Sequence, residues 1–231
     1  MNCNWMMHNN RMKKHFRMIL DIAMVVLLPM LMAYSLIGET FHEVIGSVIF
    51  VLFIIHNILN RKWYTARKRY NARMIFQICL NLCLFVFMIL QPVSGILLSK
   101  HLYTFLSTLP VTAQLRSIHM LLAYWGYCLL CVHAGTHLVA PLKKLRAKSK
   151  QGFTALSVIL ACVSVYGFVA WIRRGFPGYM SGRTAFAFFD PGEPRVFFFL
   201  DYIAIMILFM MAGCLIMYLL QKKSANRGKA R

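Results

Sequence analysis

The feature that most constrains the fold of this chain is a series of long apolar runs. Each run has about twenty residues, enough for an α-helix to cross the hydrocarbon of a bilayer. Sixty per cent of the 231 residues are hydrophobic and 14% are charged, which leaves too few polar residues to cover a soluble domain of this size. The sequence therefore predicts an all-α polytopic membrane bundle of six transmembrane helices, at 18–37, 41–59, 74–98, 118–140, 153–172 and 196–220.

The positions of the basic residues predict the orientation of this bundle. The 26 Lys and Arg outnumber the 6 Asp and Glu, for a net charge of +20, and none lies within an apolar run. Twenty of them fall in 1–17, 61–73, 141–152 and 221–231, and six in the alternate connections. By the positive-inside rule, we expect both termini in the cytoplasm and the helices in the cytoplasmic membrane. The excess indicates contact with anionic lipid and not with nucleic acid.

Histidines in the second and fourth predicted helices mark the candidate site, because ionisable residues at membrane depth are rare and usually functional. His42 and His56 are 14 residues apart, and so are His119 and His133. Fourteen residues make about four helical turns, so the two histidines of each helix share a face and lie about 21 Å apart along the axis. The predicted topology makes the two helices parallel. His42 is therefore expected opposite His119 near the outer surface, and His56 opposite His133 near the inner surface.

Two opposed imidazole pairs fit the bis-histidine ligation of two b-type haems, in which each iron takes one axial nitrogen from each helix. Zinc would need ligands that converge about 2 Å from one ion, which pairs so far apart do not provide. His137 leaves the inner pair open. It lies one turn beyond His133 on the same face and could be the ligand itself, bind a propionate or line a quinone pocket. His133 is expected at the same depth in the membrane as His56, which favours it over His137 as the inner haem ligand.

Small and cationic residues near the histidines are further candidates for cofactor binding. Gly46 and Gly126 lie near the histidine face, where they would let a porphyrin approach the backbone. Haem propionates need cationic partners, and the candidates are Arg116 near the outer surface and Arg61 near the inner surface. Arg61 could also be one of the basic residues that only set the orientation of the helices in the membrane. Weaker candidates are Lys100 and His101 outside, and Lys62 and Trp63 inside.

Four acidic residues are candidates for proton transfer, with simpler alternatives for each. Glu39 and Glu43 flank the predicted outer haem, where they could take protons or could cap the helix. Asp201 and Asp21 lie within predicted helices, where they could carry protons or hydrogen-bond a neighbouring helix.

These motifs resemble a known family, the flavinylation-associated bacterial membrane cytochrome b family, catalogued as a domain of unknown function with bis-histidine haem motifs. The resemblance covers residues 18–140 and rests on HEVIG at 42–46, HNILN at 56–60 with Trp63, SGIL at 94–97, and His119 through HAGTH at 133–137. It implies haem ligands at His42, His56, His119 and His133. It also implies electron transfer between the membrane quinone pool and outward-facing redox proteins, which often carry covalent FMN.

The predicted domain organisation is a cytoplasmic tail (1–17), a four-helix di-haem core (18–140), a basic cytoplasmic loop (141–152), two additional helices (153–220) with an outward loop (173–195), and a basic tail (221–231). We expect a di-haem electron-transfer subunit between quinone and an outward-facing flavin- or haem-containing protein. Two alternatives remain open at this point. One is a proton-coupled transporter lined by histidines, and the other is a cofactor-free membrane anchor of a redox complex.

Overall fold

The computed structural model describes residues 3–62, 71–106, 112–184, 186–187, 190 and 192–229. Among these residues, all regular secondary structure is helical and there is no strand. Six helices are long and apolar enough to cross a membrane, which confirms the predicted all-α bundle. They are α1 (Cys3–Met32), α3 (Glu39–Asn60), α5 (Ala72–Leu98), α6 (Ala113–Thr136), α8 (Lys150–Arg173) and α10 (Arg195–Lys229). The short elements are α2 (Tyr34–Ile37), η1 (Thr104–Leu106), α7 (Val139–Lys148) and α9 (Phe176–Met180).

The ends of two helices differ from the predicted runs. The helix α1 covers Cys3–Met32, so it begins within the predicted tail and ends before the predicted residue 37. A turn at Ala33 separates α2, and Gly38 then joins α2 to α3 with a φ of 85°, which favours glycine. The fourth helix, α6, ends at Thr136 with His137 as its C-cap. Hydropathy alone does not show where the backbone hydrogen bonds of a helix stop.

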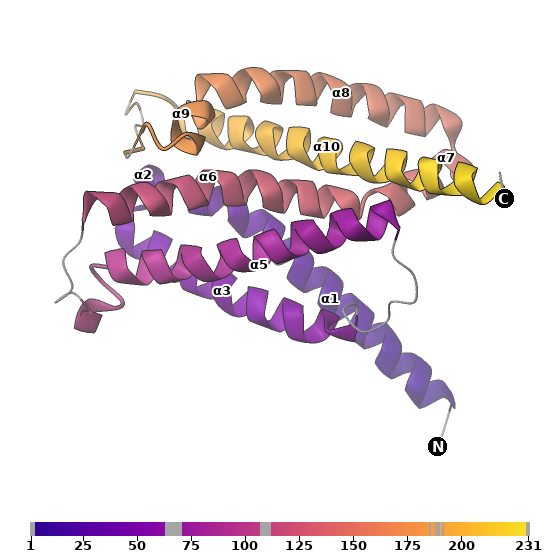
Figure 1. Cartoon of the computed structure of the whole chain (residues 1–231), viewed down its shortest axis with the longest axis horizontal. Helices are drawn as coiled ribbons and strands as arrows, with labels where there is room; N and C mark the ends of the chain where they lie inside the picture. Colours follow the sequence, from indigo (N-terminus) through magenta and orange to yellow (C-terminus); the bar gives the residue numbers. More distant parts are fainter. Residues whose placement is uncertain are drawn as a thin grey trace.

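The long helices form a bundle in which α6 is central. It packs against α5 on one side and α10 on the other, while α10 also packs along α8 and α1 along α3. Figure 1 shows that α3 and α6 both run from the α2 and α9 end of the bundle towards the α7 end. The two helices are therefore parallel, as the charge pattern predicts. Both ends of the chain lie at the α7 end (Figure 1).

Three glycines allow α10 to approach its neighbours at backbone distance. A Cβ on Gly135 would overlap the carbonyl oxygen of Met210, and one on Gly213 would overlap the carbonyl oxygen of Val132. Gly167 makes the same kind of approach from α8 to α10. Small residues at helix crossings are typical of membrane bundles, where close van der Waals packing holds helices together.

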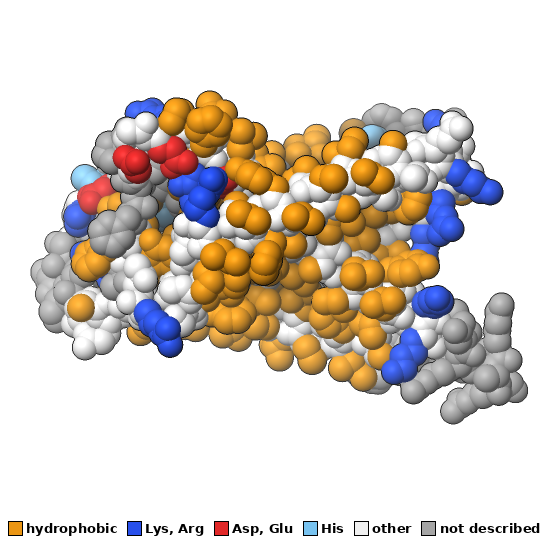
Figure 2. Space-filling model, turned by 90° about the horizontal axis from the view of Figure 1, so that it is seen from above, with side chains coloured by type: hydrophobic (Ala, Val, Ile, Leu, Met, Phe, Trp, Pro, Cys, Tyr) orange, Lys and Arg blue, Asp and Glu red, His pale blue; other side chains and the backbone are white. Residues whose placement is uncertain are grey.

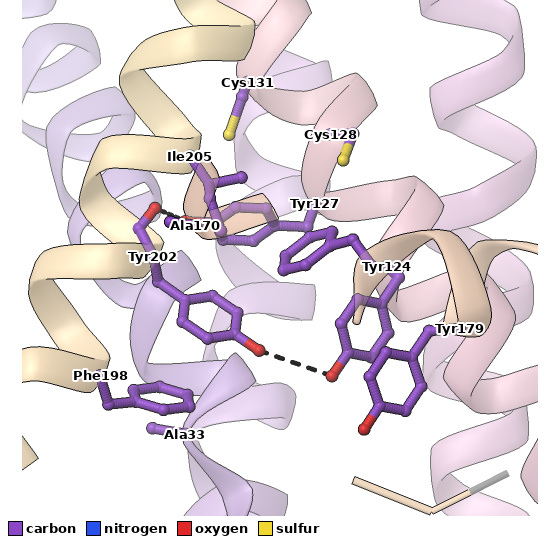
Figure 3. Close-up of a cluster of buried hydrophobic side chains, with 11 residues drawn as sticks. Ala33, Tyr124, Tyr127, Cys128, Cys131, Ala170, Tyr179, Phe198, Tyr202 and Ile205 are labelled. Atoms are coloured by element: carbon purple, nitrogen blue, oxygen red, sulfur yellow. Dashed lines mark hydrogen bonds between the residues drawn. The ribbon is translucent and has the colours of Figure 1, made fainter. Parts of the chain in front are cut away.

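A buried aromatic cluster joins α6, α9 and α10 (Figure 3). The Tyr124 and Tyr179 rings stack with centroids 4.1 Å apart, and the Tyr127 hydroxyl donates to the Tyr202 carbonyl oxygen at 2.7 Å. Pairing of each hydroxyl matters here, because an unpartnered polar group is costly to bury. The cluster fixes α9 and α10 against α6, the helix that carries His119 and His133.

The surface of the bundle carries an apolar band between two polar ends. Figure 2 shows hydrophobic side chains over the middle of the molecule and Lys and Arg side chains at both ends. Asp and Glu side chains gather at one end of the face shown. This distribution is that of a protein whose middle contacts lipid.

A buried ion cluster connects α8 to α10 at the acidic end. Asp201 is fully buried, and its carboxylate accepts hydrogen bonds from Arg173 at 2.6 Å and Arg174 at 2.7 Å. The Arg174 guanidinium also binds Glu193 through two nitrogens, at 2.6 and 2.7 Å, and the Tyr166 hydroxyl donates to Asp201 at 2.5 Å. Asp201 is therefore a structural anchor between helices, the simpler of its two predicted roles.

We expect Asp201→Ala to lower the free energy of unfolding by about 3 kcal/mol, because removal of one partner leaves the poorly exposed Arg174 without its buried carboxylate. Thermal unfolding in detergent, followed by helical circular dichroism, measures this loss. The control is Asp190→Ala, since among the described contacts the Asp190 side chain accepts only from the backbone N–H of Gly192 in its own loop, at 2.9 Å. Equal stability of the two variants would contradict the anchoring role.

Candidate functional site

A cavity of about 1460 Å³ lies between α1, α3, α5 and α6, with part of α10 in its wall. All five histidines singled out by the sequence line it: His42, His56, His119, His133 and His137. A single small-molecule pocket usually measures about 300–1,000 Å³. This histidine cavity therefore has more room than one such ligand needs, and it reaches both predicted pairs.

The structure places His42 of α3 opposite His119 of α6 in the cavity, with the two rings in a T-shaped arrangement. Their ring centroids are 6.3 Å apart, with an angle of 72° between the ring planes. Two imidazoles bound on opposite sides of one metal ion, with metal–nitrogen bonds of about 2 Å, have ring centroids roughly 6 Å apart. The observed separation is thus that of two axial ligands of one ion.

Hydrogen bonds from α5 define which nitrogen of His119 carries the proton. The Ser94 hydroxyl donates to the Gln91 carbonyl oxygen at 2.8 Å, so its oxygen is left to accept from His119 Nδ1 at 2.9 Å. His119 Nε2 is then the bare nitrogen, and it accepts from the Gln91 side-chain amide at 3.3 Å. A metal-binding imidazole needs this arrangement, with a proton held on one nitrogen and a lone pair on the other.

Gly95 brings the backbone of α5 against the His119 ring, since an added Cβ would lie 3.2 Å from His119 Cε1. Gly46 and Gly126 also line the cavity, but a Cβ there would meet its nearest neighbours at 3.8 and 3.9 Å, ordinary contact distances. The closest backbone approach to a cavity histidine is therefore at Gly95, which helical spacing does not single out, although it lies in the SGIL motif at 94–97. Two polar residues one turn apart in an apolar run, Gln91 and Ser94, were the available signal for this part of α5.

At the other end of the cavity, His56 is held by a carboxylate from α1. His56 Nδ1 lies 2.8 Å from Asp21 Oδ1. A carboxylate only accepts, so Nδ1 donates its proton to Asp21, and Nε2 is the ring nitrogen left to bind a metal. The Asn60 side-chain amide lies 3.4 Å from the same Nδ1 and donates to the His56 carbonyl oxygen at 2.9 Å. Asp21 therefore makes the hydrogen bond to a neighbouring helix that was one of its two predicted roles.

His133 and His137 lie side by side at this end, with ring centroids 5.1 Å apart. His133 is within α6 and half-buried, at electrostatic range of His56. His137 follows the last residue of α6 and is exposed. It also lines a second hollow of about 1080 Å³ nearer the end of the bundle. Both rings lie at electrostatic range of His56, so both stay candidates for its partner.

The two predicted propionate partners occupy different places. Arg116 lies in the first turn of α6, lines the histidine cavity and stacks over Phe186 with its guanidinium carbon 5.1 Å from the ring centroid. Arg61 is the C-cap of α3 and lines the second hollow, not the histidine cavity. Lys62 lines the same hollow, and Trp63 lies outside the described residues.

The acidic residues at the His42 end hold the chain that covers this end of the cavity. The Glu43 carboxylate accepts from the Ser99 hydroxyl at 2.7 Å and from the backbone N–H groups of Lys100 and Leu102 at 2.9 and 2.8 Å. Glu39 binds the Lys100 ammonium at 2.9 Å, so this cation already has a carboxylate partner. Glu39 also accepts from the Tyr34 hydroxyl, and burial together with this bond raises the pKa of Tyr34 to about 12.

The residues of the cavity fit a haem at each end. The Nδ1 contacts of His119 and His56 leave Nε2 of each ring to bind a metal, and His42 Nδ1 is buried without a hydrogen-bond partner among the described residues, a situation that a bound ligand would relieve. Within the described ranges, no group of three His, Cys, Asp or Glu converges as a polydentate metal site would require. The donor set is instead two imidazoles at one end and three at the other, in a cavity lined mainly by apolar side chains, as haem ligation needs.

Comparison with known proteins agrees with this geometry. The family described as prokaryotic cytochrome b561 matches residues 5–148, well over half of the chain. The chain belongs to the prokaryotic cytochrome b561 family. The cytochrome is therefore a multi-pass membrane protein of the b-type haem class that transfers electrons. The matched region runs from α1 to the end of α7 and holds all five cavity histidines.

This membership sets aside the transporter and the cofactor-free anchor as functions of the cytochrome. It agrees with the predicted resemblance at the level of a bacterial membrane cytochrome b, while the flavinylation-associated relationship stays a prediction. No curated protein and no solved structure matches the chain significantly. Helices α8 to α10 lie beyond the matched region.

Proposed function

We propose that the cytochrome binds two b haems, one between His42 and His119 and the other between His56 and His133. The observation that carries the proposal is the 6.3 Å separation of the His42 and His119 rings, which suits two axial ligands of one iron. The second pair lies 14 residues further along the same two parallel helices. The shared cavity supports two cofactors better than one, because it reaches both pairs.

The protein residues hold and orient these groups. Ser94 keeps the proton of His119 on Nδ1, and Asp21 does the same for His56. Arg116 lies in the cavity wall one turn before His119, where its guanidinium suits a propionate. Arg61 suits a propionate that extends into the second hollow. When bound, haem supplies one-electron chemistry between ferric and ferrous iron.

The charge distribution supports a cytoplasmic position for the α7 end, because 20 of the 26 Lys and Arg belong to the tails and connections next to this end, 1–17, 61–73, 141–152 and 221–231. His42 and His119 then lie towards the outside, and His56 and His133 towards the cytoplasm. The pairs are about 21 Å apart along the helices, a large part of the hydrocarbon thickness of about 30 Å. Two haems so placed carry an electron across most of the membrane.

We further propose that the donor and acceptor are the quinone pool and an outward-facing flavin- or haem-containing protein. Quinones are lipophilic and reach the bundle from the bilayer, and His137 offers an exposed imidazole beside both cavities. The cytochrome acts as an electron-transfer subunit, and the outward partner follows from the resemblance to flavinylation-associated cytochromes.

The test is electron transfer across a bilayer. We expect liposomes containing the purified cytochrome and a reduced quinone to reduce external ferricyanide faster than protein-free liposomes, because the haems provide a path through the hydrocarbon. The rate is followed by the loss of ferricyanide absorbance. Liposomes with the His56→Ala variant serve as the control for direct reaction at the surface. Equal rates for wild type, variant and protein-free liposomes would overturn the proposed function.

A further inference from the structure

The two ends of the histidine cavity differ in the group that holds the ring proton of a histidine. At the His42 end, His119 Nδ1 contacts a neutral acceptor, the Ser94 hydroxyl, at 2.9 Å. At the other end, His56 Nδ1 contacts a carboxylate, that of Asp21, at 2.8 Å. A carboxylate increases the electron donation of an imidazole to a bound metal more than a hydroxyl does.

We infer that Asp21 is a positioning residue that lowers the reduction potential of the haem at the His56 end. This inference rests on the proposed function, since it takes His56 as an axial ligand. A more electron-rich ligand stabilises ferric iron over ferrous iron, and hydrogen bonds to axial ligands are a recognised means of tuning haem potentials. The Asp21 charge adds to this effect, because reduction makes the iron centre less positive.

The position of Asp21 makes it specific to one haem. Three carboxylates line the histidine cavity, and the other two, Glu39 and Glu43, precede and follow His42 at the opposite end. The Glu43 carboxylate already accepts hydrogen bonds from Ser99 and Lys100, in the segment that covers the cavity. Asp21 also reaches His56 from a different helix, α1, so it locks the orientation of the ring as well as its proton.

Cationic residues near Asp21 act in the opposite direction but at longer range. The second hollow is lined by Lys13, Lys14, Arg17, Arg61 and Lys62, with Asp21 as its one carboxylate among the described lining residues. The Arg17 guanidinium donates to the Leu59 carbonyl oxygen at 2.9 Å and no hydrogen bond joins it to Asp21 among the described contacts. Exposed cations are screened by water and salt, whereas Asp21 acts through a direct hydrogen bond. Because half of the Asp21 side chain is exposed, its influence is reduced but not removed.

The experiment is a redox titration of the purified holoprotein, followed in the haem α band. We expect Asp21→Asn to favour the reduced form of one haem about tenfold, which corresponds to 59 mV for a one-electron couple, and to leave the other couple unchanged. Asp21→Glu restores the charge and should return the potential towards that of wild type. Ser94→Ala should move only the other couple. Titration in a His119→Ala background, which leaves the His56 haem alone, assigns the shifted couple.

The outcomes separate this inference from the proposed function. Wild-type protein without two haem couples would overturn the proposed function itself. Two couples that both stay in place in Asp21→Asn, or a shift confined to the couple that His119→Ala removes, would overturn the role of Asp21. Loss of haem from both Asp21→Asn and Asp21→Glu would also overturn it, since Asp21 would then be needed for assembly and not for the potential.

Discussion

Replacing His119 by alanine is expected to reduce the bound haem from two per chain to one. The variant removes one of two axial ligands whose rings lie 6.3 Å apart, and alanine offers no nitrogen to the iron. The remaining haem should keep the spectrum of a six-coordinate b-type centre, because His56 and His133 are about 21 Å further along the helices. Haem content is measured as the pyridine haemochrome relative to protein concentration.

A matched variant distinguishes loss of a ligand from loss of any histidine. His101 lies in the connection after α5, is exposed, and its nearest acidic partner is Glu39 at 3.4 Å. His101→Ala should keep two haems. His42→Ala should match His119→Ala, because both remove the same haem. Full haem occupancy in His42→Ala and His119→Ala would show that this pair is not the ligand set.

Replacing Gly213 by valine is expected to destabilise the packing of α10 against α6 strongly. A Cβ at this position would overlap the Val132 carbonyl oxygen of α6, so α10 must move away from α6 along their contact. Overpacking of a well-packed core costs typically 1–3 kcal/mol and occasionally more, and backbone has less freedom to adjust than side chains, so we expect a loss of about 3 kcal/mol. Thermal unfolding of the detergent-solubilised protein measures it.

The control adds volume to the same helix on its exposed face. Leu215 follows Gly213 by two residues and is 57% exposed, so Leu215→Phe should keep the stability of wild type within about 0.5 kcal/mol. Val132 precedes His133, so Gly213→Val should also loosen the haem at that end more than the one at His42. Similar unfolding temperatures for both variants would contradict the close approach of α6 and α10.

Much of the fold follows from local sequence patterns. A run of about twenty apolar residues is sufficient to predict a spanning helix, and the alternation of basic connections predicts that α3 and α6 are parallel. Given parallel helices, the 14-residue spacing places His42 opposite His119, because helical periodicity is a property of each helix alone. The structure agrees with this pairing.

The contacts that support the histidines could not be predicted in the same way. Ser94 reaches His119 from α5, and Asp21 reaches His56 from α1. Each contact depends on the rotation and relative height of two helices, which spacing within one helix does not determine. The sequence singled out Asp21 as an ionisable residue at membrane depth, but its partner appears only when α1 and α3 pack together.

The position of Arg61 shows another limit of spacing. It follows His56 by five residues and was predicted to serve the inner haem, whereas α3 ends before it and the side chain lines the second hollow. Likewise, Glu43 is adjacent to His42 in sequence but turns to the segment after α5. Residues near a helix end take their direction from tertiary contacts, which sequence neighbours do not fix.

The measurement that tests the account most directly is the haem-to-protein ratio of the purified wild-type protein, taken together with its dithionite-reduced spectrum. Two haems per chain and a b-type α band are the predicted result, because two histidine pairs line one cavity of about 1460 Å³. A ratio of one, in a preparation that retains its helical content and is supplied with excess haem during expression, would contradict the two-site account.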